Sequence, residues 1–325
     1  MKALLRRLAL LTAVLYLLLG LSPLVLRFAV SGHTAPPEAS PPPVASEAPT
    51  AAETGVFRIL DTGSGERYTV SDADFLRGAL PCEMALDAPD EALKAQLVAI
   101  HTFYSRRRLQ NAGADYDFTC DSAARQIYMT DDDIAAHFGD AWDTARARLD
   151  TLCASVAGAC LLYDGEPIEA PFFAISAGCT QPYEQVWASD GYPYLTAVAC
   201  PFDLLYDGYK ASAAFTPDEV RAAFPDIACT TAPEDWFSDI RYFESGYVES
   251  LSLCGTTLSG VDVRSALSLR SASFTVAYDG ERFTFTTLGW GHGVGMSQAG
   301  AIYMAQNGAD YREILAYFYP GAALG

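Results

Sequence analysis

Basic side chains and histidines are scarce in this 325-residue chain. It has 21 lysines and arginines against 40 aspartates and glutamates, a formal net charge of −19, and only four histidines. A surface this acidic repels polyanions, so we expect no nucleic-acid partner. A neutral or partly cationic polymer remains compatible with this charge.

The chain also lacks any internal repeat and the short motifs of several enzyme classes. It contains no Walker loop, no Gly-x-Ser-x-Gly elbow and no His-Glu-x-x-His pair. Phosphate-binding loops, serine-hydrolase elbows and helical zinc sites of these types are therefore excluded.

An apolar run from Leu8 to Leu26 is near the ~20 residues that a membrane-spanning helix needs. Basic residues precede it, which predicts a cytoplasmic N-terminus. Because Pro23 lies inside the run and no small-residue cleavage pattern ends it, we favour an uncleaved anchor over a signal peptide. Residues 1–30 are therefore expected to form a cytoplasmic tip and a single transmembrane helix.

The next stretch, residues 31–55, is rich in Pro, Ala, Ser, Thr and Glu. It has almost no large apolar side chain to bury, so we expect an extended extracytoplasmic linker. Residues 56–325 are left as one folded domain outside the cell membrane. With 50% hydrophobic residues, the chain can build one large domain or two modest ones.

Periodicity predicts an α+β fold, with helices and β-hairpins around a groove. A helix is expected from Glu91 to about Leu109, with Asp90 as its N-cap. Arg106–Arg108 lie in its last turn, and we interpret them as a solvated helix end. A second helical pattern covers residues 131–151.

Turn chemistry predicts the remaining elements. Asp164-Gly165 and Asp279-Gly280 each separate two strand-like runs and predict hairpins. Thr216 is placed to cap a helix over residues 217–224, and residues 310–318 read as a terminal helix. The eight cysteines allow 105 pairings, so we assign none, and a fully reduced domain is equally consistent.

The run Gly289–Ala301 reads Gly-Trp-Gly-His-Gly-Val-Gly-Met-Ser-Gln-Ala-Gly-Ala. Glycines at this density permit close approach of a ligand or of another chain segment. Composition alone leaves both open: a packed turn with a buried His292, or a site.

This run resembles the signature of the stage II sporulation protein D family, which also includes modifiers of cell-wall amidases. Glu83-Met84 followed by Glu91-Ala-Leu-Lys-Ala-Gln is similar to a second family block, and Ser176 to Trp187 resembles a third. The resemblance covers nearly all of residues 56–325, with the blocks in the family's order.

The resemblance implies that Glu83 is the catalytic acid. Its neighbours Cys82, Met84 and Ala85 are apolar or nearly so, and such surroundings raise a carboxyl pKa. Two positions depart from the family, because Ala85 replaces a proline and His101 replaces an arginine. A histidine can donate a hydrogen bond there but gives no permanent charge.

By the same resemblance, other side chains are expected to bind or orient the sugar. They are Lys94, His101, Ser176, Thr180, Arg264, His292, Ser297 and Gln298. Lys94 is equally well explained as a surface charge.

The implied activity is that of a lytic transglycosylase acting on peptidoglycan strands stripped of peptides, during engulfment in sporulation. The acid would protonate the oxygen between N-acetylmuramic acid and N-acetylglucosamine, and the muramic C6 hydroxyl would close a 1,6-anhydro ring. This internal nucleophile removes the need for the second carboxylate that ordinary glycosidases use. The family also implies an amidase partner resembling stage II sporulation protein P.

Some family members carry zinc in the segment around Cys120. Here Arg125 occupies the position of the second cysteine, and no histidine lies between His101 and Cys120. A single cysteine cannot hold zinc alone, so we expect no metal and no cofactor. Metal analysis of the purified protein tests this.

Two other functions remain open at this stage. The domain could be a non-catalytic glycan-binding enhancer of an N-acetylmuramoyl-L-alanine amidase. A metal-dependent hydrolase is disfavoured by the shortage of ligands.

Overall fold

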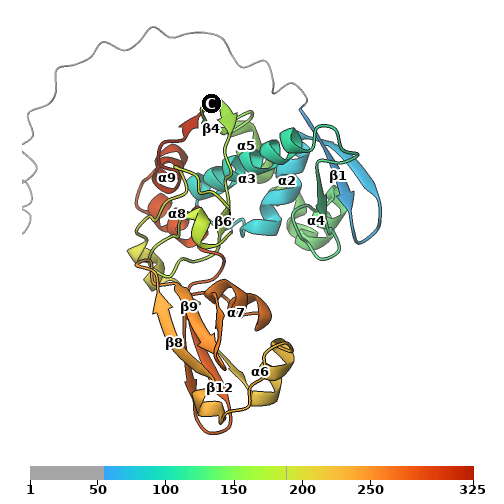
Figure 1. The fold of residues 1–325 in the computed structure, drawn as a ribbon. Coiled ribbons are helices and arrows are strands. Elements are labelled where there is room, and N and C mark those ends of the chain that lie inside the picture. Colours follow the sequence, from blue (N-terminus) through green and yellow to red (C-terminus); the bar gives the residue numbers. More distant parts are fainter. Residues whose placement is uncertain (1–54, 188) are drawn as a thin grey trace, which may run out of the picture. The chain divides into compact units, whose positions relative to one another are not determined.

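The computed structural model describes residues 55–187 and 189–325, which belong to one compact unit (Figure 1). The predicted anchor and nearly all of the predicted linker lie outside the described residues. Within the described part, no helix combines the length and the apolar character needed to cross a bilayer.

The described chain combines helices with small, mostly antiparallel sheets, which makes the fold α+β as predicted. The helices are α2 (Asp72–Glu83), α3 (Asp90–Gln110), α4 (Asp131–Phe138), α5 (Trp142–Ser155), α6 (Pro217–Ala223), α7 (Gly260–Ala266), α8 (Gln298–Gln306) and α9 (Tyr311–Phe318), with 3-10 turns η1 (Gly139–Ala141), η2 (Tyr183–Gln185), η3 (Pro201–Leu205) and η4 (Pro233–Asp235). The strands are β1 (Val56–Asp61), β2 (Arg67–Ser71), β3 (Phe118–Cys120), β4 (Leu161–Tyr163), β5 (Glu166–Pro167), β6 (Phe172–Phe173), β7 (Lys210–Phe215), β8 (Phe237–Tyr242), β9 (Val248–Leu253), β10 (Thr256–Leu258), β11 (Phe274–Tyr278), β12 (Phe283–Leu288), β13 (Met296–Ser297) and β14 (Ala323–Leu324).

Helix α3 is the centre of the first hydrophobic core, with α2, α5, α8 and α9 packed around it (Figure 1). Leu93, Leu97 and Ile100 are fully buried along it, as their helical spacing predicts. Alanines between these positions let the neighbouring helices approach on more than one side. The small sheet β2-β1-β3 closes one end of this core.

A second core lies between two three-stranded sheets, β10-β9-β8 and β11-β12-β7, with α6 and α7 beside them. Its largest fully buried side chains are Trp236, Phe274, Phe283 and Phe285. The predicted hairpins are confirmed, with β4 paired to β5 and β11 to β12. One disulfide, Cys229–Cys254, lies in this part, and the other six cysteines, all among the described residues, are free thiols.

Three local predictions are wrong. Pro89, rather than Asp90, is the N-cap of α3, because Asp90 is already helical and pairs with Arg148 at 2.6 Å. The helical stretch 131–151 breaks into α4 and α5, because Gly139 takes a positive φ of 53°. Arg106 and Arg107 are not a solvated end, since both contact the buried carboxylate of Glu169.

Candidate functional site

Glu83 is the last residue of α2, the helix that Ser71 caps at its start. Its side chain is only partly exposed. Burial raises the pKa of this carboxyl from its ordinary 4.5 to about 6. Burial penalises the charged form because the apolar surroundings solvate it poorly. A carboxyl with this pKa still carries its proton in weakly acidic solution, as a general acid requires.

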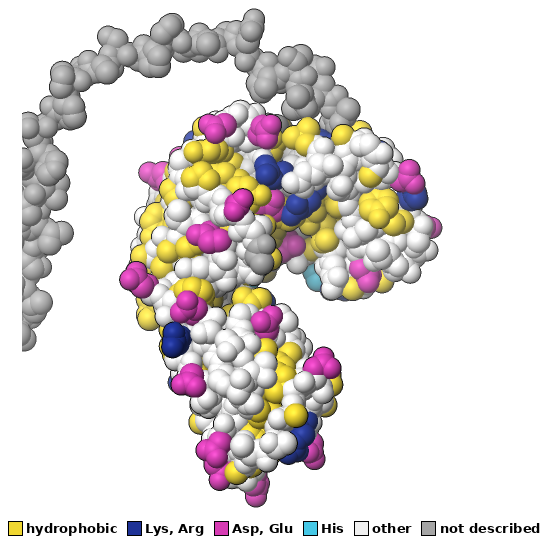
Figure 2. Space-filling model, viewed as in Figure 1, with side chains coloured by type: hydrophobic (Ala, Val, Ile, Leu, Met, Phe, Trp, Pro, Cys, Tyr) yellow, Lys and Arg dark blue, Asp and Glu magenta, His cyan; other side chains and the backbone are white. Residues whose placement is uncertain are grey.

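Glu83 lines a cavity of about 380 Å³, which we name the acid cavity. Its walls come from the end of α2, the segment after β6, the turn after η3, the glycine-rich run and α8. They include Glu83, Met84, Asp87, Ala174, Ile175, Tyr206, Asp207, Trp290, Gln298 and Ile302. The space-filling view shows the molecule hollowed between its helical part and the sheets that carry α6 and α7 (Figure 2).

Gln298 joins the glycine-rich run to the acid. Its side-chain amide donates to the backbone oxygen of Glu83 at 3.1 Å and lies 3.3 Å from the side-chain oxygen of Gln96. The two strongest family blocks, far apart in sequence, therefore meet at one cavity, and Glu83 is not remote from the glycine-rich run.

Two exposed aromatic side chains also line the acid cavity. Trp290 is 49% exposed and Tyr206 is 42% exposed, although both are large and apolar. The Arg270 guanidinium lies 4.5 Å from the Trp290 ring centre and supports the ring from one side. Flat aromatic faces held open to solvent are suited to packing against the apolar face of a sugar ring.

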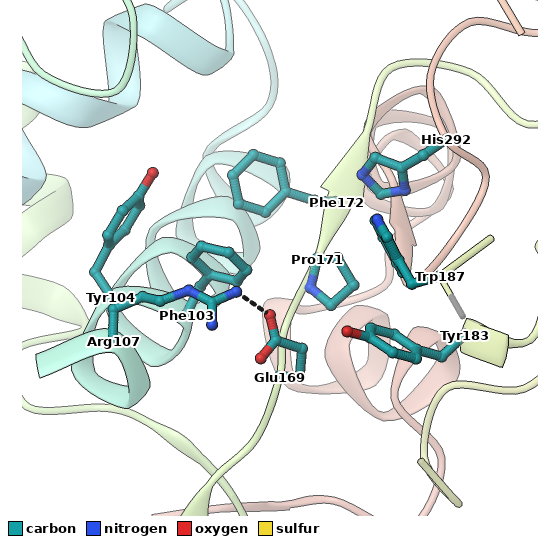
Figure 3. A pocket seen from close by; sticks show the side chains of 9 residues that line it. All are labelled: Phe103, Tyr104, Arg107, Glu169, Pro171, Phe172, Tyr183, Trp187 and His292. Carbon is teal, nitrogen blue, oxygen red and sulfur yellow. Dashed lines mark hydrogen bonds and ion pairs between the residues drawn. The ribbon is translucent and has the colours of Figure 1, made fainter. Parts of the chain in front are cut away.

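A neighbouring cavity of about 400 Å³ is walled mainly by rings, and we name it the aromatic cavity (Figure 3). Its residues are Phe103, Tyr104, Arg107, Glu169, Pro171, Phe172, Tyr183, Trp187 and His292. Two chain segments run from one cavity to the other. In the first segment, Phe172 lines the aromatic cavity and Ala174 lines the acid cavity. In the second, His292 lines the aromatic cavity and Trp290 lines the acid cavity.

The glycine-rich run lies directly on β6 and the residues after it. The Trp290 amide donates to the Ile175 carbonyl at 2.6 Å. Gly291 has a φ of 121°, and a Cβ there would lie 2.6 Å from the Cβ of Phe173. Glycine is required because the backbones approach so closely, and Trp290 and His292 are the side chains that this run contributes to the two cavities.

His292 is a neutral ring in the wall of the aromatic cavity. Burial, with a smaller effect from the charge of Arg264, lowers its pKa to about 4. Its Nδ1 accepts from the Val294 amide at 3.2 Å, and the ring also bonds the Phe172 backbone. Backbone groups thus engage the ring, and its centre lies 5.1 Å from the Trp187 ring centre. A hydrogen bond from His292 to sugar stays a prediction.

Three predicted sugar ligands are interior residues instead. Ser176, Thr180 and Ser297 are fully buried, and their hydroxyls hold the backbone together. Ser297 Oγ donates to the carboxylate of Asp203 at 2.6 Å and accepts from the Gly300 amide, which caps α8. Thr180 Oγ1 donates to the Thr196 carbonyl at 3.1 Å. These groups hold the backbone behind the cavity walls and do not line either cavity.

Lys94 and His101 also lie away from both cavities. Lys94 pairs with Glu91 at 2.6 Å, consistent with the surface-charge explanation. His101 is 6% exposed and lies between the Ala159 carbonyl, at 2.8 Å, and Asp72. Its ring ties α3 to the start of α2, which is a structural task.

The acid cavity contains two carboxylates that the family blocks did not indicate, Asp87 and Asp207. Both side chains are exposed, and neither stands in a recognisable motif. Across residues 55–187 and 189–325, no cluster of three or more His, Cys, Asp or Glu is arranged to hold a metal ion.

Comparison with known proteins identifies the family. A family model described as stage II sporulation protein matches residues 62–163, which include Glu83. Stage II sporulation protein D of Bacillus subtilis strain 168 is 33% identical over 255 residues, covering 77% of this chain and 73% of that protein.

The chain belongs to the stage II sporulation protein D family.

Stage II sporulation protein D of Bacillus amyloliquefaciens is 32% identical over 252 residues, covering 76% of this chain and 72% of that protein. An amidase enhancer of Bacillus subtilis strain 168 is 25% identical over 301 residues, covering 77% of this chain but 40% of the enhancer. The resemblance inferred from the motifs is thereby confirmed, and sporulation is the setting that the stage II sporulation protein D family shares.

Proposed function

We propose that this protein is a membrane-anchored lytic transglycosylase that cuts peptide-stripped glycan strands of peptidoglycan between N-acetylmuramic acid and N-acetylglucosamine. The observation that carries the proposal is the Glu83 carboxyl, with its pKa raised to about 6, in a cavity beside exposed aromatic rings. A protonated acid next to a sugar-stacking surface is the arrangement that glycosidic cleavage needs.

The chemistry runs through one carboxyl group. Glu83 gives its proton to the glycosidic oxygen as the bond from that oxygen to muramic C1 breaks. The C6 hydroxyl oxygen then bonds to C1, and its proton passes to the Glu83 carboxylate. The products are a 1,6-anhydro-muramic end and a free hydroxyl on the departing sugar, and Glu83 is again protonated.

Trp290, Tyr206 and Gln298 have positioning roles in this proposal. The two rings offer flat faces to sugars on the strand, and Gln298 fixes the backbone of Glu83. Effective proton transfer requires donor and acceptor within hydrogen-bond reach, so a small shift of α2 would reduce the rate.

The test uses the full-length chain in detergent with peptide-stripped glycan strands as substrate. Glu83→Gln is expected to reduce cleavage by about a hundredfold or more, because it removes the acid and keeps the shape. Asp87→Asn and Asp207→Asn are matched controls in the same cavity and are expected to retain activity. Mass spectrometry should find anhydro-muramic ends, lighter by one water than reducing ends.

Reducing ends that depend on Asp87 or Asp207 would contradict this proposal. That result would identify an ordinary two-carboxylate hydrolysis, in which one acid donates the proton and the other activates water or forms a covalent intermediate.

A second candidate is favoured by the similarity to the amidase enhancer of Bacillus subtilis. In this case the cavities hold glycan while a partner amidase resembling stage II sporulation protein P removes peptides. Stimulation of that amidase by the wild-type chain and by Glu83→Gln equally, with uncut glycan, would support the enhancer. Stimulation that requires Glu83 would support cleavage.

The location is part of the proposal. A single-pass anchor over residues 1–30 would hold the folded domain outside the cell membrane, next to the wall. Fractionation and protease digestion of intact protoplasts test it: the chain should sediment with membranes and its folded domain should be digested from outside.

A further inference from the structure

Two arginines share the one carboxylate that lines the aromatic cavity, although the chain as a whole is strongly acidic. Its one lining carboxylate, Glu169, is 5% exposed and already serves two arginines. Arg107 Nη2 lies 2.6 Å from Glu169 Oε1, and Arg106 Nε lies 3.3 Å from Glu169 Oε2. One carboxylate therefore offsets two guanidinium groups, of which Arg107 lines the cavity and Arg106 does not.

A third arginine adds to the excess. Arg264, on α7, has a buried Nε without a hydrogen-bond partner and forms no ion pair within the described part of the chain. Its charge acts on His292, which lines the aromatic cavity. Most partly buried arginines of this protein meet an aspartate or glutamate, so an uncompensated one at this place marks a position for an anion from outside.

Arg107 is the cation that reaches the cavity itself (Figure 3). It donates to Glu169 and, at 2.8 Å, to Gln110, which leaves other N–H groups of the guanidinium without a hydrogen-bond partner among the described residues. The guanidinium lies 4.5 Å from the Phe103 ring centre, so its orientation is fixed by stacking. Its side chain is 33% exposed, and solvent or a ligand can reach it.

The rest of the wall is aromatic. Tyr183 and Trp187 have ring centres 4.7 Å apart, and Trp187 lies 5.1 Å from the His292 ring. Figure 3 shows these three rings across the cavity from Phe103 and the Arg107–Glu169 pair. An apolar ring surface facing a fixed guanidinium suits a ligand with one flat face and one carboxylate.

We propose that the aromatic cavity is a subsite for a pyranose ring that carries a free carboxylate, and that Arg107 pairs with this carboxylate. The identity of the polymer rests on the proposed function. In a peptidoglycan strand, the matching group is the lactyl carboxylate of N-acetylmuramic acid, which becomes free only when the peptide is removed. Arg107 thereby distinguishes stripped from unstripped strands by charge.

The experiment measures binding and not cleavage. Full-length protein carrying Glu83→Gln is titrated calorimetrically with a peptide-stripped muramyl tetrasaccharide, with the same sugar amidated at its carboxylates, and with neutral chitotetraose. We expect amidation to weaken binding on the order of tenfold, the effect of losing one partly exposed charge-assisted contact. Chitotetraose should bind like the amidated sugar.

Arg107→Gln should abolish the preference for the free carboxylate, so that it binds the free and the amidated sugar equally, while Arg107→Lys should keep part of the preference. Arg312→Gln, which removes an exposed charge on α9 outside this cavity, should keep all of it. Because Arg107→Gln weakens the compensation of buried Glu169, the double variant Arg107→Gln/Glu169→Gln serves if the single one misfolds.

Equal binding of free and amidated sugar by the parent, or a preference that survives Arg107→Gln, would overturn the subsite. Failure of the proposed cleavage would appear separately, as absence of products from the wild-type chain, and would not affect this comparison.

Discussion

The ionisation of Glu83 links its setting to both stability and chemistry. Burial raises its pKa in the folded state to about 6, whereas the unfolded chain keeps the ordinary value of 4.5. Below pH 4.5 both states are protonated, so burial of the neutral carboxyl carries no ionisation penalty. As pH rises through 6, the unfolded state gains more from ionising, and the folded state loses stability.

Glu83→Gln is therefore expected to stabilise the protein at pH 7.5 by about 1 kcal/mol, after allowing for partial exposure of the side chain. At pH 4 the gain should vanish. Urea unfolding at both pH values measures it, with the exposed Glu166→Gln as control. A variant no more stable than the parent at pH 7.5 would mean that the carboxyl is well solvated.

At the scale of elements, the glycine-rich run decides the shape of both cavities. Gly295 has a φ of 76°, and a Cβ there would lie 2.0 Å from the Pro171 carbonyl oxygen. Gly308, after α8, has a φ of 94° but no atom within 4 Å of its Cβ position. The two positions separate backbone strain from steric clash.

Gly295→Ala is expected to cost more than about 3 kcal/mol, because strain and a backbone clash add. Gly308→Ala should cost about 1 kcal/mol, the strain alone. Thermal and urea unfolding compare them. Equal losses would show that the run can move away from β6.

Trp290, in the same element, is expected to matter for sugar more than for folding. Because it is 49% exposed, Trp290→Ala should change the free energy of unfolding by less than about 1 kcal/mol. Glycan binding should weaken about tenfold with the loss of its stacking surface. Calorimetric titration with glycan and urea unfolding of the same variant test both expectations. A large loss of stability with unchanged glycan binding would contradict them.

At the scale of the whole molecule, the glycine-rich run connects two separate hydrophobic cores. Strand β12, which precedes it, belongs to the second core, while Val294 and Met296 belong to the first. Destabilising the second core should therefore also change the position of Trp290 and the shape of the acid cavity.

The disulfide offers a direct test of this connection. Cys229 and Cys254 are 25 residues apart and enclose the whole hairpin of β8 and β9. Cys254→Ser should lower the stability of the second core by about 3 kcal/mol, since a constraint on the unfolded chain is lost. Urea unfolding followed by Trp236 and Trp290 fluorescence measures it. If Cys254→Ser loses no stability although its Cys229 is shown to be a free thiol, the sheets alone hold this core.

Several features followed from local sequence. Glycine density identified the tight loop, apolar spacing identified α3, and Asp-Gly turns identified the hairpins, because each depends on nearby residues only. Glu83 and Gln298 were found through family blocks, and the structure brings them to one cavity.

Tertiary structure decided which side chains face a cavity and which are interior. Ser176 and Ser297 are 121 positions apart in the numbering (297 − 176), yet both meet the Asp203 carboxylate, through a backbone amide and a hydroxyl respectively. From the sequence, Arg107 is interpreted as part of a solvated helix end. In the structure it pairs with Glu169, which lies 62 positions later in the chain. Side-chain direction at strand ends and turns is set by such distant partners, so periodicity cannot predict it.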